Sequence, residues 1–131
     1  MKMILAAVLI ASPLAAQSQA NRQGPNAYRV ADAALNAQYR TTLAIMAKID
    51  VSRNDSLRKG IEQPDGGAGY RASLLASQRA WLAYRDAQCT LAAYEFRGGS
   101  AESMAKGQCL TDLTRRRTAE LRQMQQSFSP K

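Results

Sequence analysis

The chain has no histidine among its 131 residues. Histidine is the usual general base and the usual metal ligand of proteins at neutral pH, so its absence removes the commonest centre of both kinds of site. A serine nucleophile would need a lysine base instead, and no familiar spacing of the two is present. The carboxylates that could act on glycans show no arrangement that separates them from surface charges; they are Asp86, Glu95, Glu102 and Asp112. We therefore expect no enzyme, no cofactor and no metal site.

A long uninterrupted apolar run is also lacking. The stretch Met3–Ala16 contains Pro13 and is shorter than the roughly 20 apolar residues of a membrane-spanning helix. It follows a lysine and precedes the small residues Ser18 and Ala20, which is the order of a signal peptide and its cleavage site. We predict that residues 1–20 are a signal peptide and that the protein is periplasmic or secreted, with no transmembrane segment after cleavage. A retained membrane anchor is the alternative.

Residues 21–131 are enough for one domain and too few for two, with a core expected over about residues 28–126. This part of the chain has seventeen basic and ten acidic side chains, a net charge of +7. A basic domain of this size favours anionic partners such as cell-wall polymers or lipid headgroups. The simpler interpretation is that the charge only keeps the protein soluble. No pattern indicates specific binding of nucleic acid.

Three segments have apolar residues at steps of three and four, the period of an amphipathic helix. The first runs over Tyr28–Ile49 and the second over about Tyr70–Glu95. The third follows Ser100, which suits the N-cap position, and frays near residues 127–130. These segments predict an all-α fold, a small antiparallel three-helix bundle.

Two segments that contain glycine separate the predicted helices. Residues 50–69 include the turn sequence Pro-Asp-Gly-Gly, so we predict a loop there with at most one irregular turn at residues 56–59. Gly98 and Gly99 are expected to end the second helix, because glycine adopts the left-handed conformation at little cost. Glu102 then lies in the first turn of the third helix, where the helix dipole favours an acid.

Cysteine occurs only twice, at Cys89 and Cys109. Two cysteines in an exported protein most simply form one disulfide. Each lies ten residues from Gly99, so an antiparallel hairpin that turns there brings both to one level on facing apolar stripes. We predict a Cys89–Cys109 disulfide that staples the second and third helices, with about 3 kcal/mol from closing the loop.

The same register predicts contacts farther along the hairpin. Residues of the two helices should face one another when their numbers sum to about 198. Trp81 is then level with Arg117, and Gln78 is level with Glu120. We predict a cation–π or stacking contact between Trp81 and Arg117. Because consecutive helical residues point 100° apart, the three arginines at 115–117 cannot form one phosphate-binding patch.

The segment SQRAWLAYRDAQC, which ends at Cys89, places two polar side chains, Gln78 and Arg85, on the apolar stripe of the second helix. Arg79 and Asp86 flank one edge of the stripe, and Tyr84 points away from it. The polar side chains of this segment are therefore expected to contact neighbouring helices, as packing positions of the fold.

An inward-pointing Arg85 needs an acceptor, because an unpaired buried charge costs several kcal/mol. We expect Asp32, at the edge of the first helix's apolar face, to be that acceptor, with Glu120 or Asp112 as alternatives. The remaining alternative is that Arg85 extends along apolar surface to solvent.

Five segments in a fixed order carry a resemblance to a known family: LNAQY at 35–39, SQRAWLAYRDAQC at 77–89, GGS at 98–100, QCL at 108–110 and LTRRRTAEL at 113–121. Together they resemble the LprI-like lysozyme-inhibitor domain family of exported bacterial proteins, over about residues 28–122. The most specific part is the pattern QRxWxxxRDxxC. The positions that match the family are Leu35, Asn36, Tyr39, Gln78, Arg79, Trp81, Arg85, Asp86, Gly98, Gly99 and Arg117.

The resemblance implies a small helical domain of the bacterial envelope and a non-enzymatic inhibitor of a lysozyme-type cell-wall hydrolase. Many members have a further cysteine near the start of the first helix, and this chain has none there, so a second disulfide is not expected. The alternative function is a basic envelope module that binds anionic cell-wall polymers or lipid headgroups.

Common animal lysozymes are strongly basic, so this basic domain would need a local acidic patch to bind one, because like net charge weakens association. Glu62 and Asp65, in the predicted loop 50–69, are the candidates for that patch. Exposed loops on rigid scaffolds often bind partners, so we regard this loop as a candidate partner site. A solvated connector without a partner is the alternative.

Overall fold

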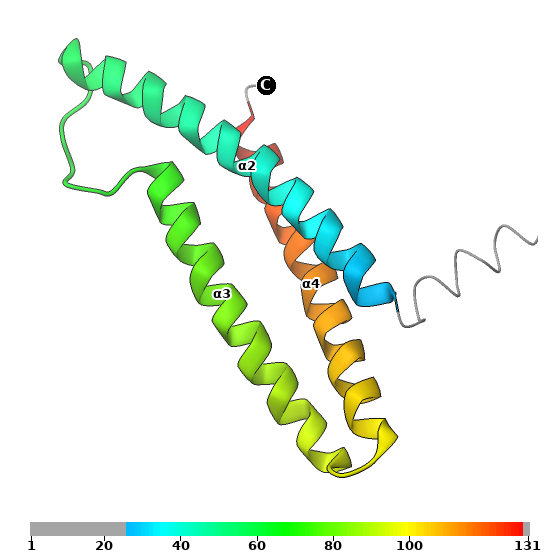
Figure 1. Cartoon of the computed structure of the whole chain (residues 1–131). Coiled ribbons are helices and arrows are strands. Elements are labelled where there is room, and N and C mark those ends of the chain that lie inside the picture. Colours follow the sequence, from blue (N-terminus) through cyan, green and yellow to red (C-terminus); the bar gives the residue numbers. More distant parts are fainter. Residues whose placement is uncertain (1–25, 130–131) are drawn as a thin grey trace, which may run out of the picture.

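The computed structural model describes residues 26–129, and the predicted signal peptide lies outside the described residues. Three helices follow one another in the chain, with a short 3-10 turn after the second; they are α2 (Ala27–Arg58), α3 (Tyr70–Ala93), η1 (Tyr94–Phe96) and α4 (Ser100–Phe128). No strand occurs between residues 26 and 129. The predicted all-α, three-helix fold is confirmed (Figure 1).

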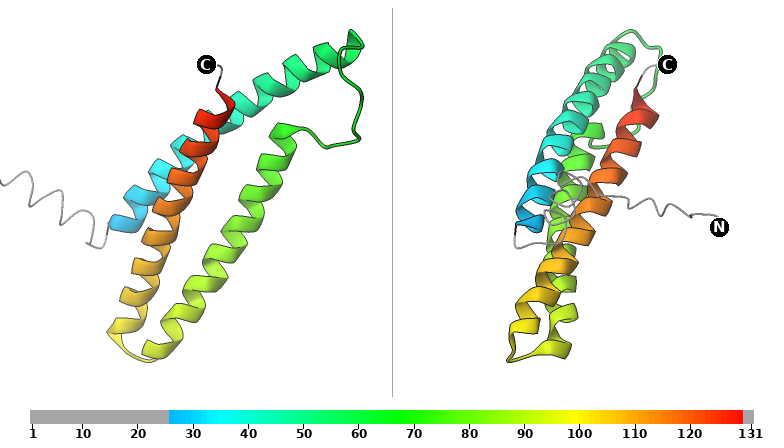
Figure 2. Two further views of the ribbon diagram at one scale, coloured as in Figure 1. Left: turned by 180° about the vertical axis from the view of Figure 1, so that it is seen from behind. Right: turned by 90° about the vertical axis from the view of Figure 1, so that its right-hand side faces the viewer.

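The helices run up, down and up, so that α3 is antiparallel to both of its neighbours (Figure 1). α3 and α4 form a hairpin, and α2 packs across it with most of its contacts on α4. Figure 2 shows that α2 extends past the hairpin at one end, while the α3–α4 turn projects past the start of α2 at the other. The bundle therefore has two different ends: a loop end around residues 59–69, and the end at which α3 turns into α4 around η1.

The first helix is longer than the sequence analysis predicted. Residues 50–58, assigned there to a loop, continue α2 without a break. No glycine or proline interrupts them, and Asp55 pairs with Arg58 and Lys59 at the helical spacings i,i+3 and i,i+4. The helix ends before Gly60, whose φ of 70° is the left-handed conformation. The Pro-Asp-Gly-Gly turn was correct evidence for a loop, but it marks the loop's centre and not its start.

The boundaries around the glycine pair also differ slightly from the prediction. α3 ends at Ala93, and η1 adds one tighter turn before Gly98, which has a φ of 82°. Ser100 is the first residue of α4, and the N-cap position belongs to Gly99. The Glu102 carboxylate, in the first turn, accepts a hydrogen bond from the Gly98 N–H at 3.1 Å. The expected acid is thus present at the helix start, and it holds the turn directly.

The hydrophobic core lies where α2 crosses the hairpin. Its buried members are Leu35, Met46, Leu74 and Leu121, and the partly buried side chains around them are Tyr39, Leu43, Ile49, Trp81 and Met124. Each fully buried side chain of this size contributes about 1.5–3 kcal/mol relative to an exposed one. All three helices therefore depend on one small apolar cluster.

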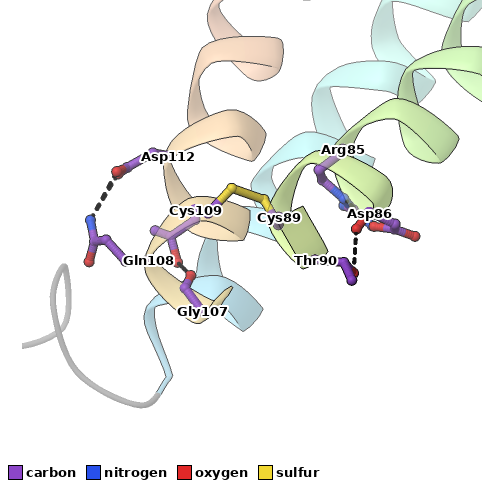
Figure 3. The surroundings of a disulfide bond; sticks show 9 residues. Arg85, Asp86, Cys89, Thr90, Gly107, Gln108, Cys109 and Asp112 are labelled. Carbon is purple, nitrogen blue, oxygen red and sulfur yellow. Dashed lines mark hydrogen bonds and ion pairs between the residues drawn. A yellow bond between two sulfur atoms is a disulfide. The ribbon is translucent and has the colours of Figure 1, made fainter. Parts of the chain in front are cut away.

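A disulfide joins Cys89 of α3 to Cys109 of α4, as predicted from the spacing (Figure 3). The Cα atoms are 5.4 Å apart, and the Cys89 side chain is completely buried. The bridge closes the α3–α4 turn, with Cys89 five residues before Tyr94, the first residue of η1. It fixes the register of the hairpin on which the polar contacts depend.

Candidate functional site

Trp81 lies between two buried arginine side chains. The guanidinium carbon of Arg117 is 5.8 Å from the centre of its ring, which confirms the predicted cation–π contact. The guanidinium carbon of Arg85 is 5.3 Å from the same ring. This second contact was not predicted from the sequence, although Trp81 and Arg85 have the i,i+4 spacing that brings helical side chains together.

Arg85 is 6% exposed, so the alternative in which it extends to solvent is wrong. Its Nη1 is 3.4 Å from an oxygen of Asp32, the predicted partner, and its Nε donates to Asp86 at 2.9 Å. Asn36 donates to the other oxygen of Asp32 at 3.1 Å and so holds this acceptor in place. The Tyr28 ring also lies 5.5 Å from the guanidinium carbon, and burial raises the pKa of the Tyr28 hydroxyl, an effect that Arg85 partly offsets.

The two alternative acceptors for Arg85 have other partners. Asp112 accepts hydrogen bonds from the Gln108 side chain on the outside of α4 (Figure 3). Glu120 accepts one from Nη1 of Arg117 at 3.0 Å. Arg85 therefore binds Asp32 of α2 across the helix interface and its neighbour Asp86 within α3.

Arg117 forms a second polar network, which lies farther from the disulfide along the hairpin than the network of Arg85. Its Nε donates to Gln78 at 3.1 Å, its Nη2 donates to Ser77 at 2.9 Å, and its Nη1 donates to Glu120. Gln78 and Glu120, predicted to be level with each other, thus meet through one guanidinium group. All three nitrogens have an acceptor, which offsets much of the cost of burying the charge.

Of the remaining family-motif positions, Leu35 is buried in the core and Tyr39 is partly buried against it, whereas Arg79 is exposed. Tyr84, which was expected to point away from the apolar stripe, is also exposed. Because the inward-pointing polar side chains of the motif are occupied by internal contacts, they are not poised for chemistry on a substrate.

At the loop end, both candidate acidic residues bind one arginine of α2. Arg53 contacts Asp65 at 2.7 Å and Glu62 at 3.7 Å. The Gly67 N–H and then Arg53 hold the pKa of the Asp65 carboxyl below its ordinary value, and the same pairing raises the pKa of Arg53. The loop is folded back on α2, so its acidic side chains are compensated inside the molecule.

The start of α3 is capped by a residue from another helix. The two oxygens of Asp50, in α2, accept hydrogen bonds from the N–H groups of Tyr70 and Arg71 at 2.7 and 2.9 Å. Gly69 precedes this turn with a φ of 88°, and a Cβ at that position would be 3.0 Å from an Asp50 oxygen. The sequence gives only an indirect signal of this cap, because Gly69 offers no side chain of its own to the helix start.

Two open cavities of about 460 and 520 Å³ lie beside this cap. Both are bordered by Arg53, Tyr70 and Phe128, and the two rings pack edge to face with their centres 5.5 Å apart. The smaller cavity reaches Met46 and Leu74 of the core. Its position shows that the packing loosens where α2 separates from the hairpin.

The other end, which we call the hairpin tip and define as residues 86–112, has a different surface. Four large apolar side chains are exposed there: Leu91 (60%), Tyr94 (48%), Phe96 (45%) and Met104 (74%). The tip has four acidic and two basic side chains, a net charge of −2. The rest of the described chain has thirteen basic and six acidic side chains, a net charge of +7. The tip is thus the acidic, apolar part of a basic protein.

Within residues 26–129, no cluster of three or more cysteine or carboxylate side chains could hold a metal ion. None of the helices α2, α3 and α4 is apolar enough over sufficient length to cross a membrane.

Comparison with known proteins identifies the type of domain. A family model described as lysozyme inhibitor LprI matches residues 11–121. An uncharacterized protein of Rhizobium meliloti (strain 1021) is 46% identical over 100 residues, which make up 76% of this chain and 67% of that protein. No solved structure matches the chain.

Proposed function

The chain belongs to the lysozyme inhibitor LprI family, and from this premise we propose that it binds and inhibits a lysozyme-type cell-wall hydrolase. The observation that carries the proposal is the family match, which covers α2, α3 and most of α4. The internal use of the motif side chains supports a non-enzymatic role, in which a rigid scaffold presents a surface to its target.

The proposed location is the periplasm or the extracellular space. A disulfide such as Cys89–Cys109 persists in oxidising compartments and is rare in the reducing cytosol. The predicted signal peptide, residues 1–20, supports the same location. A cell-wall hydrolase acts in that compartment, so inhibitor and target would meet there.

The test is a turbidity assay of cell-wall lysis with the purified, oxidised protein comprising residues 21–131. We expect lysis by at least one lysozyme class to slow as the molar ratio of protein to enzyme rises. Calorimetric titration of the enzyme without cells would then show direct binding. Unchanged lysis at a large molar excess, with several lysozyme classes, would refute the proposal.

A second candidate is a basic module that binds anionic cell-wall polymers or lipid headgroups. The net charge of +7 outside the hairpin tip favours it. Such binding could also slow lysis, because the protein would coat the wall and shield it from the enzyme. Cells incubated with the protein, washed and then treated with lysozyme separate the two, since only coating persists through the wash. Coating should also weaken steeply with salt.

A further inference from the structure

We propose that the hairpin tip, residues 86–112, is the surface that enters the substrate cleft of a basic lysozyme-type hydrolase. The inference rests on the proposed function and assigns the contact surface within it. Four properties of the tip support it: its exposed apolar side chains, its charge, its rigidity and its shape.

Four of the ten large apolar side chains that are exposed in the described residues lie at the tip. Leu91 lies in the last turns of α3, Tyr94 and Phe96 make up most of η1, and Met104 lies near the start of α4. Their exposed fractions range from 45 to 74%. Single exposed apolar side chains are ordinary on a protein surface, but aromatic residues and methionine gathered at one end are characteristic of interfaces. Buried by a partner, these side chains would supply most of the binding energy.

The charge of the tip is opposite to that of the remaining molecule. Glu102 accepts from an uncharged backbone N–H, so it keeps its negative charge while it orders the turn. Asp86 and Asp112 lie on the outer sides of α3 and α4, on either side of the disulfide (Figure 3). Asp86 is paired with Arg85. Asp112, among the residues that the structure describes, accepts only from the uncharged Gln108 amide and so keeps its charge available to a partner. An acidic tip on a basic body orients the molecule as it approaches a basic enzyme, with the tip forward. The like net charge of the two proteins is then no obstacle to this one orientation.

The tip is held in one conformation before any partner arrives. The Cys89–Cys109 bridge fixes the two helices, and the Gly98 N–H bonds the Glu102 carboxylate. The guanidinium carbon of Arg97 lies 3.8 Å from the centre of the Tyr94 ring, which orders the turn further. A preordered surface loses less conformational entropy on binding than a flexible loop.

The tip is also convex. In both views of Figure 2, as in Figure 1, the turn between α3 and α4 extends past the first residues of α2. η1 packs against α3 and α4. A narrow projection of this kind fits the concave cleft in which a hydrolase binds its polymer, and occupation of that cleft excludes the substrate.

The loop end also exposes apolar side chains, such as Ile61 at 72%, but it lacks the uncompensated acidic charge. Its acidic side chains Glu62 and Asp65 bind Arg53, and Asp50 binds the start of α3. A partner that recruited these carboxylates would first have to break contacts that hold the fold. The observations therefore favour the tip over the predicted partner loop.

The experiment compares three variants in which one exposed apolar side chain becomes lysine. Met104→Lys changes the tip, Ile61→Lys changes the loop end, and Val51→Lys changes α2; the three side chains are 74, 72 and 71% exposed. Each variant gains the same charge at a site of similar exposure. Thermal unfolding and circular dichroism establish that each variant folds like the wild type.

We expect Met104→Lys to weaken binding to the inhibited lysozyme by about tenfold or more, and the other two variants to change it less than about twofold. Phe96→Ala, which adds no charge, should weaken binding in the same direction. A wild-type protein that inhibits no lysozyme would refute the proposed function, before any variant is compared. An inhibitory wild type that Ile61→Lys weakens and Met104→Lys does not would overturn the assignment to the tip.

The alternative is that the apolar, acidic tip binds a second copy of this basic protein, so that the protein self-associates. Sedimentation of the wild type and of Met104→Lys tests it. A wild-type dimer that becomes monomeric in Met104→Lys, with inhibition unchanged, would overturn the proposal. A monomeric wild type with weakened inhibition in the variant supports it.

Discussion

At the hairpin tip a disulfide joins α3 to α4, whereas at the loop end ion pairs and the Asp50 cap hold the chain to α2. The tip is stapled covalently and exposes apolar side chains. The loop end has its charges compensated internally and borders two open cavities. We infer that the two ends have different roles. At the tip, the disulfide keeps the chain ordered, so its apolar side chains can remain exposed to solvent instead of being buried to stabilise the fold.

Of the changes considered, removing the disulfide should have the largest effect on the difference in stability between the hairpin tip and the loop end. We expect Cys89→Ser combined with Cys109→Ser to lower the free energy of unfolding by about 3 kcal/mol, the entropy of closing a loop of this size. Urea unfolding measures the loss, and amide hydrogen exchange should accelerate over residues 86–112 and change little over residues 59–69. Reductant should destabilise the wild type and leave the double variant unaffected. Equal acceleration at both ends would remove the distinction between them.

Gly69→Ala should have the next largest effect, at the opposite end. Its φ of 88° and ψ of 166° lie in a region that only glycine readily adopts, which costs a residue with a Cβ about 1–3 kcal/mol, and the added Cβ would approach Asp50 to 3.0 Å. Gly60→Ala is the matched control, because Gly60 has a φ of 70° and nothing within 4 Å of the same atom. We expect Gly69→Ala to lower the urea midpoint more than Gly60→Ala does. Equal shifts would show that the contact with Asp50 is unimportant.

Asp50→Ala tests the cap itself. The loss of a carboxylate that accepts two N–H groups at a helix start typically costs about 1 kcal/mol. Asp55→Ala, in the same helix, removes only surface ion pairs, which are typically worth about 0.3–0.5 kcal/mol. Urea unfolding of both variants, with hydrogen exchange at residues 70–73, compares them. A smaller effect for Asp50 than for Asp55 would contradict the role of the cap.

Asp65→Asn should have the smallest effect, and that effect should depend on pH. The pKa of the Asp65 carboxyl lies below its ordinary value of 3.8, mainly because of the Gly67 N–H and then because of Arg53. A lowered pKa in the folded state stabilises the protein above about pH 4, and this contribution disappears as the pH falls through the folded-state value. Urea midpoints of wild type and variant should therefore differ slightly at pH 6, and the difference should shrink as the pH is lowered below about 4. A difference that grows in acid would contradict this pairing.

The regular features of the molecule could be predicted from the sequence because they repeat at a fixed spacing. Apolar periodicity predicted three helices, and the equal distance of Cys89 and Cys109 from Gly99 predicted the disulfide and the register. From that register followed the contact of Trp81 with Arg117. The need of a buried charge for an acceptor predicted Asp32 as a partner of Arg85.

The contacts that the sequence analysis missed depend on where separate segments meet. The extension of α2 over residues 50–58 brings Asp50 to the start of α3 and Arg53 to the loop. Because residues 50–58 were predicted to lie in a loop, neither the Asp50 contact nor the Arg53 contact could be predicted. The bond from Arg85 to its chain neighbour Asp86 was missed for another reason, since adjacent helical residues point 100° apart and meet only when a long side chain bends.

The sequence alone determined the helical class, the family, the disulfide and the inward position of the motif's polar side chains, because each follows from local spacing along a helix or a hairpin. The tertiary structure decided which end of the bundle is free to meet a partner. Glu62 and Asp65 look like an exposed acidic patch in the sequence, yet Arg53 holds both. The acidic and apolar residues of the tip look unremarkable one by one, and only the projection of the hairpin past α2 brings them together on one exposed end. Charge and exposure are properties of a surface, and a surface exists only after distant segments have packed.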